Sequence, residues 1–108
     1  MGTWGDEPWD NDAGADWFAT FFRGIDVDER IEFALDSDDF QEVRAACYVL
    51  AVLGRVYVWP GDFSRLARSL EKAIALLKSA EDEDYEDIKE QISKERRALE
   101  ERRMSIHD

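Results

Sequence analysis

The chain has 108 residues, with 26 acidic and 14 basic side chains, a net charge of −12, and a single cysteine. This length fits one domain with one core, the charge disfavours contact with nucleic-acid phosphates and anionic membranes, and a lone cysteine excludes an internal disulfide. Residues 1–16 contain five acids and no Lys or Arg, unlike a secretory signal peptide, and no apolar stretch is long enough to span a membrane, so we expect a cytoplasmic protein.

The charge is unevenly distributed along the chain. Residues 1–40 hold 12 acids and 2 bases, residues 41–80 hold 3 acids and 6 bases, and residues 81–108 hold 11 acids and 6 bases. We therefore expect both acidic flanks to pack around the mildly basic middle, although solvent screening keeps each exposed ion pair weak.

The first predicted helix covers residues 12–23. Four aromatic side chains recur there at the spacing of one helical face: Trp17, Phe18, Phe21 and Phe22. Acids at the amino end suit the helix dipole, and Gly24 is a stop signal.

Acidic N-caps predict the next two helices. Asp26 stands three residues before Glu29, the spacing of a capping box, and begins a short second helix. Asp38 and Asp39 are both candidates for the N-cap of a third helix. The broad apolar face of that helix should form much of the core and consists of Phe40, Val43, Cys47, Leu50, Ala51 and Leu53.

The stretch "RVYVWPGD" interrupts the helical pattern, because residues 56–59 favour extended structure and Pro60 disfavours a helix before it. At most a short extended piece is expected there. Asp62 is a plausible N-cap for a fourth helix that runs to about Ser79. Its apolar stripe is the clearest in the chain: Phe63, Leu66, Leu70, Ile74 and Leu77.

Residues 80–108 predict a mostly polar C-terminal helix, with Ser79 and Asp82 at capping-box spacing before it. Its narrow apolar stripe contains Tyr85, Ile88, Ile92, Leu99 and Ile106. Glu95 and Arg102 interrupt that stripe, which disfavours an autonomous coiled coil. The helix either docks on its own chain or forms a homodimer contact, so the chain is a monomer or a homodimer through this helix.

The opening "MGTWGDEPWDND" is unusually rich in residues that fix backbone shape and offer apolar surface. Trp4 and Trp9 each carry roughly 150–250 Å² of mostly apolar surface, enough to pin an irregular segment onto a helical core. We expect residues 1–11 to form an arm docked on the helical core of residues 12–79. The alternative is an exposed aromatic loop that grips a partner, because Trp is favoured at binding hot spots.

The same opening resembles the start of an uncharacterised family of small bacterial proteins, a domain of unknown function with the pattern M-G-x-W-G-x-G-P-F-x-N-D. This chain has Glu7 where that family has Gly, and Trp9 where it has Phe. A weaker likeness covers residues 38–55. The resemblance implies a helical bacterial protein and carries no activity.

The sequence offers little catalytic chemistry. His107, the only histidine, is the penultimate residue, and Cys47 lies in an apolar run. The spacing of Asp10, Asp12 and Gly14 suggests a calcium loop, but its sixth and twelfth positions do not fit an EF-hand. We expect no catalytic residues, no metal site and no cofactor, and therefore a protein that is not an enzyme.

Four acids recur at helical spacing near the second helix: Asp28, Glu32, Asp36 and Asp39. Without opposite charges beside them they would repel one another and attract a cationic surface. The sequence therefore predicts an acidic interaction module for a basic protein, of an inhibitor or immunity-like kind, with Trp4 and Trp9 as further binding candidates. A structural or oligomeric role is the alternative, and a carboxylate-based hydrolase is a third hypothesis.

Overall fold

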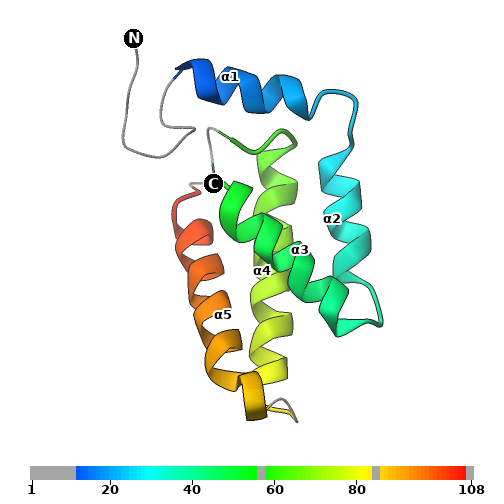
Figure 1. The fold of residues 1–108 in the computed structure, drawn as a ribbon, viewed down its shortest axis with the longest axis vertical. Coiled ribbons are helices and arrows are strands. Elements are labelled where there is room, and N and C mark those ends of the chain that lie inside the picture. Colours follow the sequence, from blue (N-terminus) through cyan, green and yellow to red (C-terminus); the bar gives the residue numbers. More distant parts are fainter. Residues whose placement is uncertain (1–11, 56–57, 84–85, 107–108) are drawn as a thin grey trace.

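The structure is a computed structural model that describes residues 12–55, 58–83 and 86–106. These residues form an all-α fold, as predicted, and contain no strand (Figure 1). Val58 and Trp59 lie in a turn and loop, so the possible extended piece does not form a strand there. The elements in chain order are α1 (Asp12–Phe21), α2 (Val27–Leu35), α3 (Phe40–Leu53), α4 (Phe63–Glu81), the 3-10 helix η1 (Glu86–Ile88) and α5 (Lys89–Met104).

Helix α4 is the centre of the bundle. It contacts α2, α3 and α5, and its apolar stripe is fully inaccessible at Leu66, Leu70 and Leu77. These residues recur at spacings of four and seven, which places them along one face of a helix. Core side chains from the neighbouring helices complete the cluster: Ile31, Leu35, Val43, Cys47, Leu50, Ile92 and Leu99.

Three aspartates cap the helices that the sequence predicted. The side chains of Asp26 and Asp39 accept hydrogen bonds from the backbone N–H groups of Glu29 (3.0 Å) and Gln41 (2.9 Å). Asp62 accepts from two such groups at the start of α4. These bonds satisfy N–H groups that have no partner inside the helix and so fix where each helix begins.

The C-terminal helix docks on its own chain, which was one of the two predicted arrangements. Ile92 and Leu99 are fully inaccessible, and α5 packs mainly on α4 with a second contact to α3. The capping box predicted at Ser79 and Asp82 is wrong: Ser79 lies inside α4, and the Asp82 N–H bonds back to the Ser79 carbonyl as α4 ends. The continuing apolar face of α4 carries that helix past Ser79 to bury Ala80.

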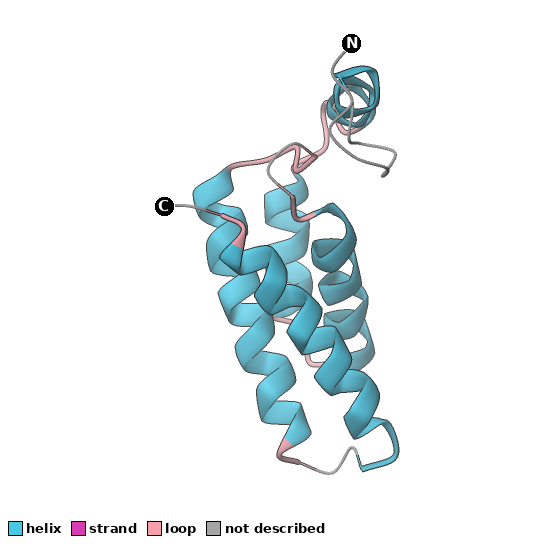
Figure 2. Ribbon diagram, turned by 90° about the vertical axis from the view of Figure 1, so that its left-hand side faces the viewer, coloured by secondary structure: helices cyan, strands magenta, loops and turns pink. Residues whose placement is uncertain are grey.

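Helix α1 lies across one end of the bundle, and Figure 2 shows it end-on and set apart from the other helices. It ends at Phe21, two residues before its predicted end, because the next N–H groups form turn hydrogen bonds. Gly24 follows with φ of 86°, a left-handed conformation that favours glycine. The turn redirects the chain into α2, so α1 and α2 meet at a corner.

Truncating Leu99 to alanine tests the docking of α5. We expect Leu99→Ala to lower the free energy of unfolding by about 2–5 kcal/mol, because it leaves a cavity between α4 and α5. Met104→Ala is the matched control on the same helix; its side chain is exposed and the change should cost less than about 0.5 kcal/mol. Urea unfolding measures both, and equal small losses would contradict the docked helix.

Candidate functional site

The acidic ridge comprises Asp28 and Glu32 on α2, Asp36 at the C-terminal end of α2, and Asp39 after it. Its first three members face basic side chains of α4. Glu32 accepts two hydrogen bonds from the Arg65 guanidinium, at 2.6 and 2.9 Å, and Asp36 pairs with Lys72. The sequence alone shows no charges that would compensate these carboxylates, but α4 supplies them to Glu32 and Asp36 from more than 30 residues later in the chain. The mutual repulsion is therefore offset inside the molecule.

Asp28 is the buried member of the ridge, with only 6% of its surface exposed. Its two carboxylate oxygens accept from the Trp59 indole N–H at 2.9 Å and the Asp62 backbone N–H at 2.8 Å. Arg65 lies 4.0 Å away. Asp28 therefore joins α2 to the start of α4, where the positive end of the helix dipole also favours a carboxylate.

The other predicted binding residues have different positions. Asp39 is exposed, and its side chain caps α3. Trp4 and Trp9 lie outside the described residues, as does the predicted arm of residues 1–11, so their docking stays a prediction.

The α1–α2 corner presents four large apolar side chains to solvent: Trp17, Phe21, Ile25 and Phe33. The Trp17 and Phe21 rings stack with centroids 5.0 Å apart, and Phe21 meets Phe22 edge-on. Phe33 is 81% exposed, although it lies within α2, in its last turn. Exposed aromatic groups of this kind are typical of protein contact surfaces.

A hollow of about 480 Å³ lies within this corner, between the Gly24 turn and the outer face of α2. Ile25 and Phe33 give it apolar walls, and Asp26, Glu29 and Arg30 give it charged ones. The two carboxylates outnumber the guanidinium, so the hollow combines apolar surface with a negative potential.

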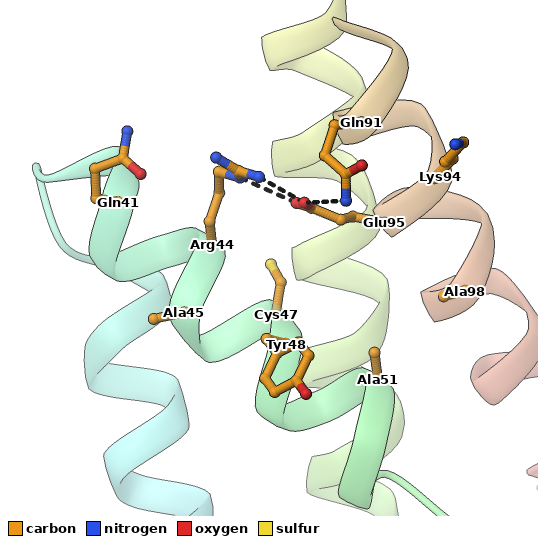
Figure 3. A pocket seen from close by; sticks show the side chains of 10 residues that line it. All are labelled: Gln41, Arg44, Ala45, Cys47, Tyr48, Ala51, Gln91, Lys94, Glu95 and Ala98. Carbon is orange, nitrogen blue, oxygen red and sulfur yellow. Dashed lines mark hydrogen bonds and ion pairs between the residues drawn. The ribbon is translucent and has the colours of Figure 1, made fainter. Parts of the chain in front are cut away.

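A second concave surface, the α3–α5 groove, has a volume of about 510 Å³ (Figure 3). Arg44 of α3 bonds to Glu95 of α5 through two hydrogen bonds, at 3.0 and 2.5 Å, and Gln91 bonds to the same carboxylate. Seven more residues line the groove: Gln41, Ala45, Cys47, Tyr48, Ala51, Lys94 and Ala98. Glu95, which interrupts the apolar stripe of α5, thus pairs with Arg44 of α3.

Arg102, the second polar residue in that stripe, also bonds to α3. Its Nε donates to the Ala51 carbonyl at 2.7 Å, in the last turn of α3. Helix α3 has no basic residue of its own in that turn. A cation from α5 therefore complements the negative end of the α3 dipole.

Cys47 lies buried at the groove beside the Arg44–Glu95 pair. Burial raises the pKa of Cys47 to about 12, and the neighbouring Glu95 carboxylate acts in the same direction. A thiolate is the nucleophilic form of cysteine, so this thiol is poorly suited to nucleophilic chemistry at neutral pH.

The described part of the chain holds no group of three or more His, Cys, Asp or Glu side chains placed to bind a metal ion. Within the same ranges, no helix combines the length and the apolar character that crossing a membrane requires.

A family model for a domain of unknown function, DUF4259, matches residues 2–105. The chain belongs to this family. The match confirms the expected membership of a family of unknown function, and it includes α4 and α5. Searches of curated proteins and of solved structures found no significant match. The DUF4259 domain thus spans the whole helical bundle and the residues before it.

Acid should lower the free energy of unfolding of this DUF4259 domain by protonating Glu95. The hydrogen bonds from Arg44 hold the pKa of Glu95 below its ordinary value of 4.5, against the opposing effect of burial. Because the pKa is lower in the folded state, this carboxylate stabilises the fold above about pH 4.5, and that contribution disappears as the pH falls through the folded pKa. Urea unfolding of the wild type should show this loss. The free energy of unfolding of Glu95→Gln should depend less steeply on pH in that range. Equal slopes for the two proteins would contradict the role of this pair.

Proposed function

We propose that this protein is a cytoplasmic binding module that holds a basic protein partner at the α1–α2 corner, as an inhibitor or immunity protein would. The observation that carries the proposal is the set of exposed apolar side chains in the most acidic third of the chain. Residues 1–40 contain 12 acids and only 2 bases. Apolar anchors with acids around them suit a partner surface that mixes basic and apolar groups.

The apolar anchors are the stacked Trp17 and Phe21 rings on α1 and Phe33 on α2. Their exposure in the free protein costs stability that a partner surface can recover, since covering apolar area is favourable at about 25 cal/mol per Å². Aromatic residues are enriched in the central contacts that dominate binding energy. Phe33 is the strongest candidate, because it is the most exposed of them.

The hollow beside Phe33 fits a lysine or arginine side chain of the partner. The aliphatic part of such a side chain can pack on Ile25 and Phe33, and its charge can approach Asp26 and Glu29. A cation near the Phe33 ring also gains cation–π attraction. This arrangement supports a basic partner over an acidic one.

The members of the acidic ridge differ in how available their carboxylates are to a partner. Asp36 is exposed at the edge of α2, and its pair with Lys72 is solvent-accessible, so it can contribute to the attraction of a cationic surface. Asp28 is buried and holds α4, which makes it a structural residue. Glu32 is intermediate, because Arg65 already occupies its carboxylate. In this proposal Trp4 and Trp9, which precede α1 in the sequence, are further contact residues.

Binding is favoured over catalysis by the chemistry of the described residues. Cys47 has a raised pKa and little exposure, and the α3–α5 groove beside it is lined mainly by alanines, amides and the paired Arg44 and Glu95. We therefore propose that the protein acts by covering a partner.

The test compares proteins captured by immobilised wild-type protein, Phe33→Ala and Tyr48→Ala, quantified by mass spectrometry. We expect the wild type to enrich a basic protein, and Phe33→Ala to lower affinity for it by roughly 30-fold, which corresponds to a hot-spot loss of about 2 kcal/mol. Tyr48→Ala removes an equally prominent ring from α3 and should leave the capture unchanged.

Glu29→Gln adds a kinetic readout once that basic protein is purified. The variant should slow its association and weaken the dependence of the association rate on salt, because it removes a charge at the rim of the hollow. Loss of capture with Tyr48→Ala but not with Phe33→Ala would contradict the proposal, as would identical profiles for all three proteins.

A further inference from the structure

We propose that the α3–α5 groove is a binding site for a small aromatic carboxylate. This site is separate from the α1–α2 corner and independent of the function proposed for that corner. The volume of the groove, about 510 Å³, lies within the range of pockets that take small molecules, roughly 300–1,000 Å³. The groove also divides into a polar end and an apolar end, which suits a molecule that has both kinds of surface.

The polar and apolar side chains of the groove gather at opposite ends (Figure 3). The polar end consists of Gln41, Arg44, Gln91, Lys94 and Glu95. The apolar end consists of Ala45, Cys47, Tyr48, Ala51 and Ala98. A few polar groups beside an apolar wall fix the orientation of a bound ligand. The molecule that fits therefore has one polar end and one apolar end.

The polar end favours an anion over a cation. It holds two cations, Arg44 and Lys94, against one carboxylate, Glu95. The Arg44–Glu95 pair is neutral as a unit, so the net charge of this end comes from the Lys94 ammonium group. Gln41 and Gln91 stand in the first turns of α3 and α5, which places the positive ends of both helix dipoles here as well. A carboxylate group matches this end in charge, and the two amides can donate hydrogen bonds to it.

The apolar end suits an aromatic body. Ala51 of α3 and Ala98 of α5 leave room between the two helices, and Tyr48 forms a wall of the groove. The Tyr48 ring is 71% exposed, so a ligand that stacks on it removes apolar surface of both molecules from water. Offset stacking of two rings adds a further attraction. An aromatic carboxylate therefore uses both ends of the groove at once.

NMR titration of the isotopically labelled protein with three probes of similar size and different charge tests the inference. The probes are naphthoate, naphthamide and naphthylmethylamine, which are an anion, a neutral molecule and a cation. We expect naphthoate to shift the backbone amide signals of α3 and α5 saturably, with a Kd of about 1 mM or below. Naphthamide should bind more weakly and the amine most weakly. The net charge of −12 attracts the amine at long range, so a preference for the anion must come from the groove itself.

Two variants of the groove locate the site. Ala98→Leu keeps a good helix-forming residue but fills the space between α3 and α5, and it should abolish the binding of naphthoate. Lys94→Gln removes the unbalanced charge and should raise the Kd of naphthoate by about two- to fivefold, the range expected for an exposed ion pair. Lys78→Gln is the matched control, because it removes an exposed lysine of α4 that does not line the groove. Its Kd should equal that of the wild type.

Phe33→Ala is the second control, because it removes an exposed ring from the α1–α2 corner and should bind naphthoate like the wild type. Circular dichroism and thermal melts establish that each variant is folded. The inference is overturned if naphthoate does not bind at millimolar concentration, or if the amine binds as well as the anion does. Binding that survives Ala98→Leu or is lost with Phe33→Ala would place the probe elsewhere and would also overturn it.

Discussion

The arrangement of the bundle depends on one buried carboxylate. Asp28 accepts hydrogen bonds from the Trp59 indole and from the backbone at the start of α4, and it lies 4.0 Å from Arg65. Burial of an ionised carboxylate is costly unless it is hydrogen-bonded and near opposite charge, and here both conditions are met. Gly61 makes the approach possible, since a Cβ atom there would lie 2.3–2.6 Å from the Asp28 carboxylate atoms.

This contact decides which side chains of α2 face outward. With Asp28, Glu32 and Asp36 turned toward α4, the opposite side of α2 carries Phe33 outward, and the Gly24 turn sets α1 across the end of the bundle. On the other side of α4, the Arg44–Glu95 pair joins α3 to α5, with a groove beside it. The molecule thus presents an acidic aromatic corner and a separate groove with a mildly basic lining.

Local signals in the sequence predicted much of this fold. Asp26, Asp39 and Asp62 are N-caps as expected, because capping depends on residues only two or three positions apart. The ion pairs were not predictable, since Arg65 and Lys72 lie far along the chain from Glu32 and Asp36. Two features of the site can be inferred from helical spacing. Asp28 lies on the same side of its helix as the core residues Ile31 and Leu35, which suggests burial. Phe33 lies on the opposite side of that helix, which suggests exposure.

A double-mutant cycle between Asp28 and Trp59 tests the central role of the buried carboxylate most directly. Asp28→Ala, Trp59→Phe and the double variant are compared with the wild type by urea unfolding. Each single change should lower the free energy of unfolding by about 2 kcal/mol or more, because it leaves a buried polar group without its partner. The account predicts a coupling energy of about 1–3 kcal/mol, so the double variant loses clearly less than the sum of the single losses. Strictly additive losses would contradict it.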